Sequence, residues 1–264
     1  MTDNNSIIQW GGSGKVLVFL HYFGGSAQSW RWVGEKLKDT FRCISINLPG
    51  FGGAPSLQAP SIQCYAKYVQ DQLSLLSVNN YILIGHSMGG KISMQIAANA
   101  ADGSVNQLIL IAPFPPSIEP ITTKEKERML KMPDHREAEK TIAKITKKPL
   151  NDDQYTLAVQ NQLDVDNTTR QWWILKGIDH SIVNIVKSLH LPITVLASED
   201  DPAIAADVIR KKVISVFGQS KLITTRHAGH LLPMEEPGWV AERIKSIVSD
   251  PSTNMAAGTI KILF

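Results

Sequence analysis

The chain has 264 residues, of which 43% are hydrophobic and 19% charged, and its formal net charge is +3. This composition excludes a disordered polypeptide, and the small net charge gives no indication of a nucleic-acid footprint or a membrane-surface patch. No apolar run is long enough to span a bilayer, and the polar N-terminus lacks a basic leader region. We therefore expect a cytoplasmic protein that acts on a small-molecule substrate, with no nucleic acid and no membrane among its partners.

Short β-rich runs alternate with helical stretches along most of the chain. Several runs are apolar on both faces, as at residues 16–20 and 108–111, which a parallel sheet covered by helices on both sides requires. We predict an α/β fold with a mostly parallel, doubly wound sheet. The predicted strands are 6–10, 16–20, 42–48, 81–84, 105–112, 193–197 and 222–225, and the predicted helices are 29–38, 65–77, 91–101, 203–217 and 236–249.

The alternation stops between residues 113 and 190, where no convincing strand occurs and the composition is helical for about four segments. We interpret residues 113–190 as an inserted helical lid, or cap. Residues 1–112 and 191–250 then form the catalytic domain. Within the insertion, residues 122–148 mix basic and acidic side chains, a pattern typical of a solvated helix face.

The last segment, residues 251–264, follows a helix stop and ends in the strand-like stretch 259–264. Its role is open between an edge strand, a partner contact and a mobile tail. The oligomeric state is open as well, with a homodimer as one alternative.

The sequence Gly-His-Ser-Met-Gly at residues 85–89 places a serine between an apolar run, 81–84, and a helical stretch, 91–101. This context is typical of the nucleophile elbow, a tight strand-to-helix turn that exposes the hydroxyl of Ser87 at the edge of a sheet. A serine hydroxyl is a poor nucleophile at neutral pH, so it needs a base and a group that orients the base.

Candidates for both partners lie downstream of the serine. Three carboxylates, Glu199, Asp200 and Asp201, follow the predicted strand at 193–197, and His230 follows the last predicted strand. The order of serine, acid and histidine resembles that of the α/β-hydrolase family.

The resemblance extends to other segments of the chain. The acid loop of the family reads Gly-x-x-Asp, often followed by Pro, so Asp201 is the implied acid and Ser198 stands at the family glycine. Asp200 remains the alternative acid. Residues 49–52 match the Pro-Gly-x-Gly turn of the family. The resemblance implies the α/β-hydrolase fold and a catalytic triad of Ser87, Asp201 and His230.

An oxyanion hole requires two donors aimed at the oxygen that becomes negative during acyl transfer. One is the backbone N–H of Met88. The loop 21–26 resembles the His-Gly-x-x-Gly loop of the family, which implies that Phe23 lends the second N–H. Tyr22 replaces a family glycine, so its phenol either reaches the pocket and shapes substrate choice or packs in the loop.

We expect no metal and no cofactor. His227 and His230 lie three residues apart without a third ligand, and residues 11–15 read as a hairpin turn rather than a phosphate loop.

The predicted function is that of a serine hydrolase that cleaves a carboxylic ester or related acyl bond through an acyl-enzyme on Ser87. A thioester, lactone, amide or activated C–C bond is an alternative target. The candidate substrate-binding residues are apolar and indicate a small, largely apolar substrate: Tyr22, Phe114, Trp172 and Leu231. Competing hypotheses keep the fold for lyase chemistry, for cofactor-free peroxidase, perhydrolase or oxygenase chemistry, or for a non-catalytic small-molecule receptor.

Overall fold

The computed structural model of the chain describes residues 6–100, 103–119 and 121–250. The strand-like stretch predicted at 259–264 lies outside the described residues. No helix in these described ranges is both long and apolar enough to cross a membrane.

A seven-stranded sheet in the described part of the chain has the order β1-β3-β2-β4-β5-β6-β7. Strand β1 runs antiparallel to β3, and all other neighbours are parallel, which confirms the predicted fold class. The strands are β1 (Ile7–Trp10), β2 (Val16–Leu20), β3 (Arg42–Ile46), β4 (Tyr81–His86), β5 (Val105–Ile111), β6 (Ile193–Ser198) and β7 (Lys221–Thr225).

The order of the strands reverses between β2 and β4. The chain first moves outward from β2 to β3 and then returns to the other side of β2, continuing from β4 to β7. The loops that follow β2 and β4 therefore leave the sheet beside each other, in opposite directions. In open α/β sheets, ligands bind at the carboxyl ends of the strands at such a switch point.

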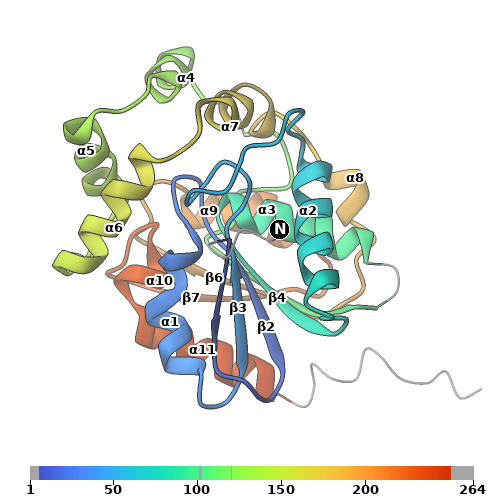
Figure 1. The fold of residues 1–264 in the computed structure, drawn as a ribbon. Helices are drawn as coiled ribbons and strands as arrows, with labels where there is room; N and C mark the ends of the chain where they lie inside the picture. The colour runs from blue at the N-terminus through green and yellow to red at the C-terminus, as the bar shows by residue number, and fades with distance from the viewer. Residues whose placement is uncertain (1–5, 101–102, 120, 251–264) are drawn as a thin grey trace, which may run out of the picture.

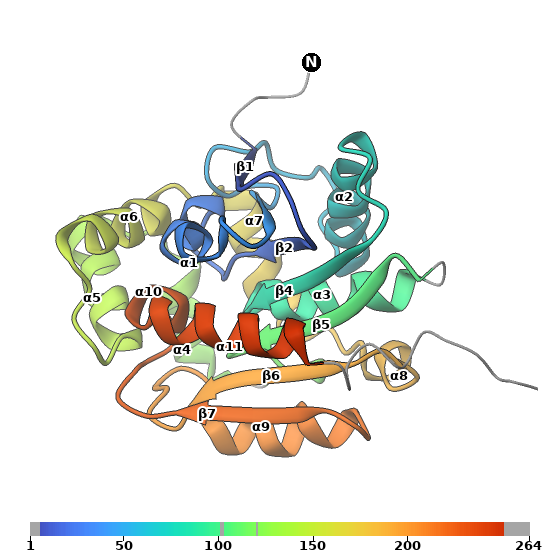
Figure 2. The ribbon, with the colours of Figure 1, turned by 90° about the horizontal axis from the view of Figure 1, so that it is seen from below.

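Helices cover both faces of the sheet. Successive strand residues point to opposite sides, so apolar strands present side chains on both faces that must be buried. Leu17 and Phe19 of β2 pack in the cluster that contains one pair of helices, whereas Val18 and Leu20 pack in the cluster on the other face. The first pair is α1 (Arg31–Leu37) and α11 (Pro237–Ser249), and the second face carries α2 (Ile62–Leu75), α3 (Met88–Asn99), α8 (Val183–Val186) and α9 (Ala206–Lys212) (Figures 1 and 2).

The segment between β5 and β6 is helical, and its main helices lie together above the sheet in the view of Figure 1. Each helix begins after a residue whose side chain accepts a hydrogen bond from the backbone N–H three residues later, the usual N-cap interaction. The helices are α4 (Thr123–Leu130), α5 (His135–Ile145), α6 (Asp152–Leu163) and α7 (Asn167–Trp172), with caps at Thr122, Asp134, Asn151 and Asp166.

One helix boundary and one additional short helix differ from the predictions. Helix α3 begins at Met88, directly after Ser87, although Gly89 and Gly90 have low helix propensity. A Cβ on Gly89 would lie 2.5 Å from the carbonyl oxygen of His21, so glycine allows the helix to approach the end of β2. A short helix, α10 (Leu232–Glu235), also precedes α11, just after the predicted catalytic histidine.

Candidate active site

Ser87 occupies the sharp turn between β4 and α3. Its backbone has φ +54° and ψ −115°, a conformation that a residue with a side chain rarely adopts. Strand β5 and the segment after it hold this conformation, because the Ser87 N–H donates to the Ile111 carbonyl at 3.0 Å and the Phe114 N–H donates to the Ser87 carbonyl at 2.9 Å. The turn fixes the direction of the hydroxyl, as a nucleophile elbow requires.

Two consecutive hydrogen bonds connect Ser87 to His230 and His230 to Asp201. The Ser87 Oγ lies 2.9 Å from His230 Nε2, and His230 Nδ1 lies 2.8 Å from Asp201 Oδ2. The carboxylate accepts only, so it holds the proton of the imidazole on Nδ1 and leaves Nε2 free to accept from the serine hydroxyl. The Asp201 side chain is only 1% exposed.

The second oxygen of Asp201 accepts hydrogen bonds from the backbone N–H groups of Ala203, at 2.7 Å, and Ile204, at 3.0 Å. Both carboxylate oxygens are therefore held in place. The neighbouring carboxylate, Asp200, instead accepts from the His227 N–H at 2.8 Å. The structure thus brings Asp201 to His230 and directs Asp200 away from it.

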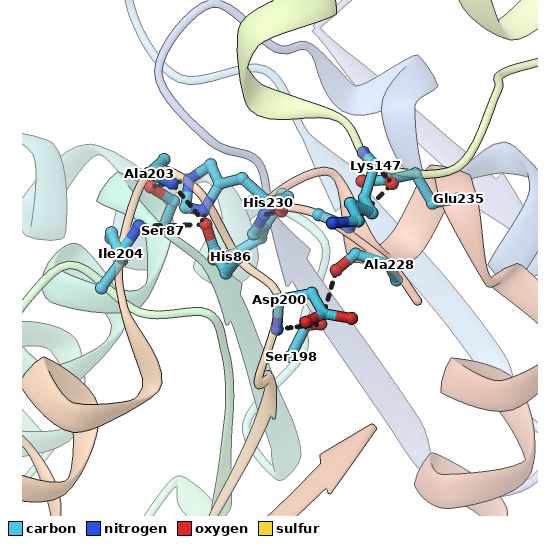
Figure 3. Close-up of polar contacts among 12 residues, drawn as sticks. His86, Ser87, Lys147, Ser198, Asp200, Ala203, Ile204, Ala228, His230 and Glu235 are labelled. Atoms are coloured by element: carbon cyan, nitrogen blue, oxygen red, sulfur yellow. Dashed lines mark hydrogen bonds and ion pairs between the residues drawn. The ribbon is translucent and has the colours of Figure 1, made fainter. Parts of the chain in front are cut away.

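Ser198, which stands at the family glycine, joins two loops. Its hydroxyl donates to the Ala228 carbonyl and accepts from the Asp200 N–H, so it connects the acid loop to the segment that carries His230 (Figure 3). A glycine at this position could not make these two hydrogen bonds, so Ser198 adds a direct contact between the two loops.

The backbone N–H groups of Phe23 and Met88 are the predicted oxyanion donors. Neither donates a hydrogen bond to any acceptor in the described part of the chain, whereas the N–H of Gly25 in the same loop donates to Tyr22. Met88 is also the first residue of α3, so its N–H belongs to the positive end of the helix dipole. The two amides are consequently available to an oxygen of a ligand.

Two buried histidines hold the loops around the site. His21 donates from Nδ1 to the Tyr22 carbonyl at 2.8 Å, and its Nε2 accepts from the Leu48 N–H at 3.0 Å. The Nε2 of His86 donates to the His230 carbonyl at 2.7 Å. Burial lowers the pKa of His21 to about 4, and burial also lowers the pKa of His86 well below its usual value. Both imidazoles are thus neutral near pH 7, and both make hydrogen bonds to backbone groups of the loops around the site.

Glu235 connects the loop of His230 to the helical insertion. One of its carboxylate oxygens accepts hydrogen bonds from the backbone N–H groups of Gly229, Lys147 and Lys148, each at 2.8 Å. In addition, the N–H of His230 donates to the Ile145 carbonyl at 2.8 Å. The end of α5 is therefore fastened to the loop that carries His230 (Figure 3).

A cavity of about 930 Å³ opens at Ser87 and His230. Of the predicted substrate-binding residues, Tyr22 and Phe114 line it, and Trp172 and Leu231 do not. Leu231 is fully buried in an apolar cluster that also contains Tyr22 and residues of α5 and α6.

Trp172 stacks on Tyr65 of α2, with ring centroids 4.7 Å apart, and its neighbour Trp173 lines the cavity instead. Successive residues on a helix point about 100° apart, so the two indoles face different surroundings. The sequence identifies the pair of indoles but does not decide which ring faces the cavity.

Sequence reasoning missed three functional candidates: Gln162, Arg170 and Glu235. Gln162 and Arg170 line the cavity, and both are at least 95% buried. They lie within helices α6 and α7, and no local motif singles them out. Glu235 precedes a proline-started helix, and only its contacts with distant backbone groups show its role.

The sequence of the chain matches a known protein family. The family model described as the alpha/beta hydrolase fold matches residues 15–153. The chain belongs to the α/β-hydrolase fold family.

Individual curated relatives match only part of the chain. An uncharacterized protein of Mycobacterium bovis is 33% identical over 102 residues, which cover 38% of this chain and 30% of that protein. The 2-succinyl-6-hydroxy-2,4-cyclohexadiene-1-carboxylate synthase of Escherichia fergusonii is 32% identical over 87 residues, 33% of this chain and 34% of the synthase. The chain thus matches about a third of the length of these curated relatives.

Among solved structures, the esterase from Exiguobacterium antarcticum is similar with a TM-score of 0.84 and 17% identity, covering 92% of this chain and 95% of the esterase. At this identity, the similarity establishes a common fold.

The low pKa of His21 predicts acid sensitivity. The pKa is about 4 in the folded protein and about 6.5 in an unfolded chain, so the unfolded state binds more protons between these two values. The free energy of unfolding should therefore fall as the pH drops from 6.5 to 4, by on the order of 3 kcal/mol from this residue. Urea unfolding at several pH values should show a shallower dependence in His21→Gln. An equal slope in both proteins would contradict the assignment.

Substitution of Glu235 by Gln should weaken the connection between the insertion and the His230 loop. The amide removes the charge from three hydrogen bonds, and we expect a loss of about 1 to 3 kcal/mol in the free energy of unfolding. Hydrogen exchange at the Gly229, Lys147 and Lys148 amides should become faster. Glu236→Gln is the matched control, because its half-exposed pair with Lys148 should contribute under about 1 kcal/mol. Equal effects of the two substitutions would argue against the role of Glu235.

Proposed function

We propose that the protein is a serine hydrolase that cleaves a carboxylic ester, or a related acyl bond, of a small and largely apolar substrate. The observation that carries this proposal is the hydrogen-bonded line from Ser87 Oγ through His230 to Asp201, at 2.9 and 2.8 Å. These are the distances at which a base can accept the proton of a nucleophile. Family membership supports a hydrolase, and the unpaired N–H groups of Met88, next to Ser87, and of Phe23, in the cavity wall, support acyl transfer.

In the proposed mechanism, Ser87 Oγ attacks the carbonyl carbon of the substrate while His230 Nε2 takes the hydroxyl proton. The carbonyl oxygen becomes negative and accepts hydrogen bonds from the N–H groups of Phe23 and Met88. His230 then gives its proton to the leaving alcohol, which departs and leaves an acyl-enzyme on Ser87. A water molecule repeats the attack, with His230 as base, and releases the acid. Asp201 keeps the imidazole in the required tautomer throughout.

The cavity supports the proposed substrate size. Its volume of about 930 Å³ is within the range of small-molecule sites, and aromatic side chains of Tyr22, Phe23, Phe114 and Trp173 form part of its wall. We further propose that residues 113–190 act as a lid, since α4 to α7 contribute many of the cavity residues. Residues 1–112 and 191–250 form the catalytic domain in this proposal, with the reaction in the cytoplasm.

The similarity to a synthase keeps lyase chemistry as a second candidate. A lyase would use His230 and the two amides on an enolate-like oxygen, without requiring an acyl-enzyme. The two reactions therefore differ in whether a covalent bond forms on Ser87.

A fluorophosphonate probe tests the nucleophile directly. The intact protein should form a single adduct on Ser87, detected by mass spectrometry of its peptides, because the activated serine attacks phosphorus as it attacks a carbonyl. Ser87→Ala should form no adduct and should not hydrolyse short aryl esters. A folded wild-type sample that stays unlabelled would rule out the acyl-enzyme mechanism.

The two neighbouring aspartates provide a matched pair for the acid. Asp201→Asn should lower kcat on an aryl ester by on the order of 10³- to 10⁴-fold, since an amide can donate to Nδ1 and favour the wrong tautomer. Asp200→Asn should change kcat only a few-fold, because Asp200 contacts the His227 backbone. A larger loss in Asp200→Asn than in Asp201→Asn would overturn the assignment.

A further inference from the structure

A buried arginine lies in the wall of the cavity. Arg170, on α7, is 4% exposed and lines the same cavity as Ser87 and His230. Its guanidinium carbon lies 5.7 Å from the centroid of the Phe23 ring. Phe23 is the residue whose backbone N–H is the proposed oxyanion donor, and its side chain and Arg170 line the cavity that contains Ser87 and His230.

Arg170 has no acidic partner among the described residues. Its Nη2 donates to the Gln162 carbonyl at 2.9 Å and its Nη1 to the Met129 carbonyl at 3.4 Å, while its buried Nε has no acceptor. Burial lowers the pKa of the guanidinium from its ordinary value, and no carboxylate acts in the opposite direction. Buried charges in proteins are normally paired, because removal of an isolated charge from water is costly.

Most carboxylates of the cavity wall are already neutralised by other cations. Glu125 contacts Arg128 and Lys144, Glu119 contacts Lys212, and Glu137 contacts Lys140. These pairs are partly exposed, as are the remaining lysines of the wall, so water and counter-ions can compensate their charges. Arg170 is therefore the buried cation of the described cavity wall whose charge is left for a ligand to balance.

We propose that Arg170 binds a carboxylate of the substrate, so that the preferred substrates are esters whose acyl part ends in a carboxylate a few carbon atoms from the scissile bond. This inference rests on the proposed function and narrows its substrate class from apolar esters to esters with an apolar body and one anionic end. A planar guanidinium matches the two oxygens of a carboxylate, and its carbonyl partners hold it in place beforehand.

A purely structural role is the competing explanation. The two carbonyl partners lie near the carboxyl ends of α4 and α6, where a cation interacts favourably with the helix dipole. In that case Arg170 would stabilise the insertion without affecting the choice of substrate. The two roles differ in how the substitution of Arg170 changes the ratio between charged and neutral substrates.

The test compares methyl hydrogen glutarate with methyl pentanoate, which carries a methyl group in place of the carboxylate. Hydrolysis is followed by proton release at constant pH. The wild type should prefer the anionic ester in kcat/KM, and Arg170→Gln should lower this preference by about tenfold to a hundredfold, mainly through KM, as loss of a charge-assisted hydrogen bond predicts. Arg170→Lys should retain part of the preference.

Lys124→Gln is the matched control, since Lys124 is an exposed cation of the same wall. It should leave the ratio within about twofold. A wild type that prefers methyl pentanoate would overturn the proposal. It would also be overturned if Arg170→Gln and Arg170→Lys each lowered kcat/KM by the same factor for methyl hydrogen glutarate and for methyl pentanoate.

A binding measurement separates this proposal from the proposed hydrolysis. Calorimetry with Ser87→Ala and methyl hydrogen glutarate should show binding that is lost when Arg170→Gln is added. If the wild type hydrolyses neither ester but this binding occurs, the proposed function fails and the carboxylate site stands. Absence of binding to Ser87→Ala would overturn the carboxylate site, whatever the hydrolysis of methyl pentanoate shows.

Discussion

The strained backbone of Ser87 is the constraint on which the rest of the site depends. A positive φ at a residue with a side chain costs about 1 to 3 kcal/mol, so it persists only where the surroundings enforce it. Here β5 and the segment after it hold both backbone polar groups of Ser87, and Gly89 lets α3 approach the end of β2. The same close approach brings the backbone of His21, which begins the loop that carries Phe23, against α3. One strained turn therefore fixes both the hydroxyl of Ser87 and the start of α3, where the unpaired N–H of Met88 lies.

The class of fold and the positions of Ser87 and His230 could be predicted because they depend on local patterns. Apolar runs of strand length mark the sheet, and a serine between glycines on a strand-to-helix turn marks the elbow. The late histidine follows from the order of the elements. The acid was harder to predict, since Asp200 and Asp201 are adjacent. The structure places only Asp201 beside His230, because Ser198 and the Ala203 and Ile204 amides fix the loop.

The wall of the cavity could not be predicted, because it depends on how distant segments meet. Trp172 and Trp173 are indistinguishable in sequence, and the choice between them is made by Tyr65, more than a hundred residues earlier. Arg170 occupies an ordinary helical position and becomes unusual only when α4 and α6 surround it. The patterns of a single helix carry no information about such neighbours.

The carboxylate of Glu235 has a consequence for how this protein can change over evolutionary time. Inserted helical segments in a conserved sheet are often pictured as exchangeable parts. Here the insertion and the His230 loop share one carboxylate oxygen, and the His230 amide itself donates to the end of α5. A transplanted insertion without matching backbone donors would remove two of the three hydrogen bonds to this buried carboxylate and leave only that from Gly229. New substrate preferences are therefore more accessible through single replacements in the cavity wall than through exchange of the whole segment.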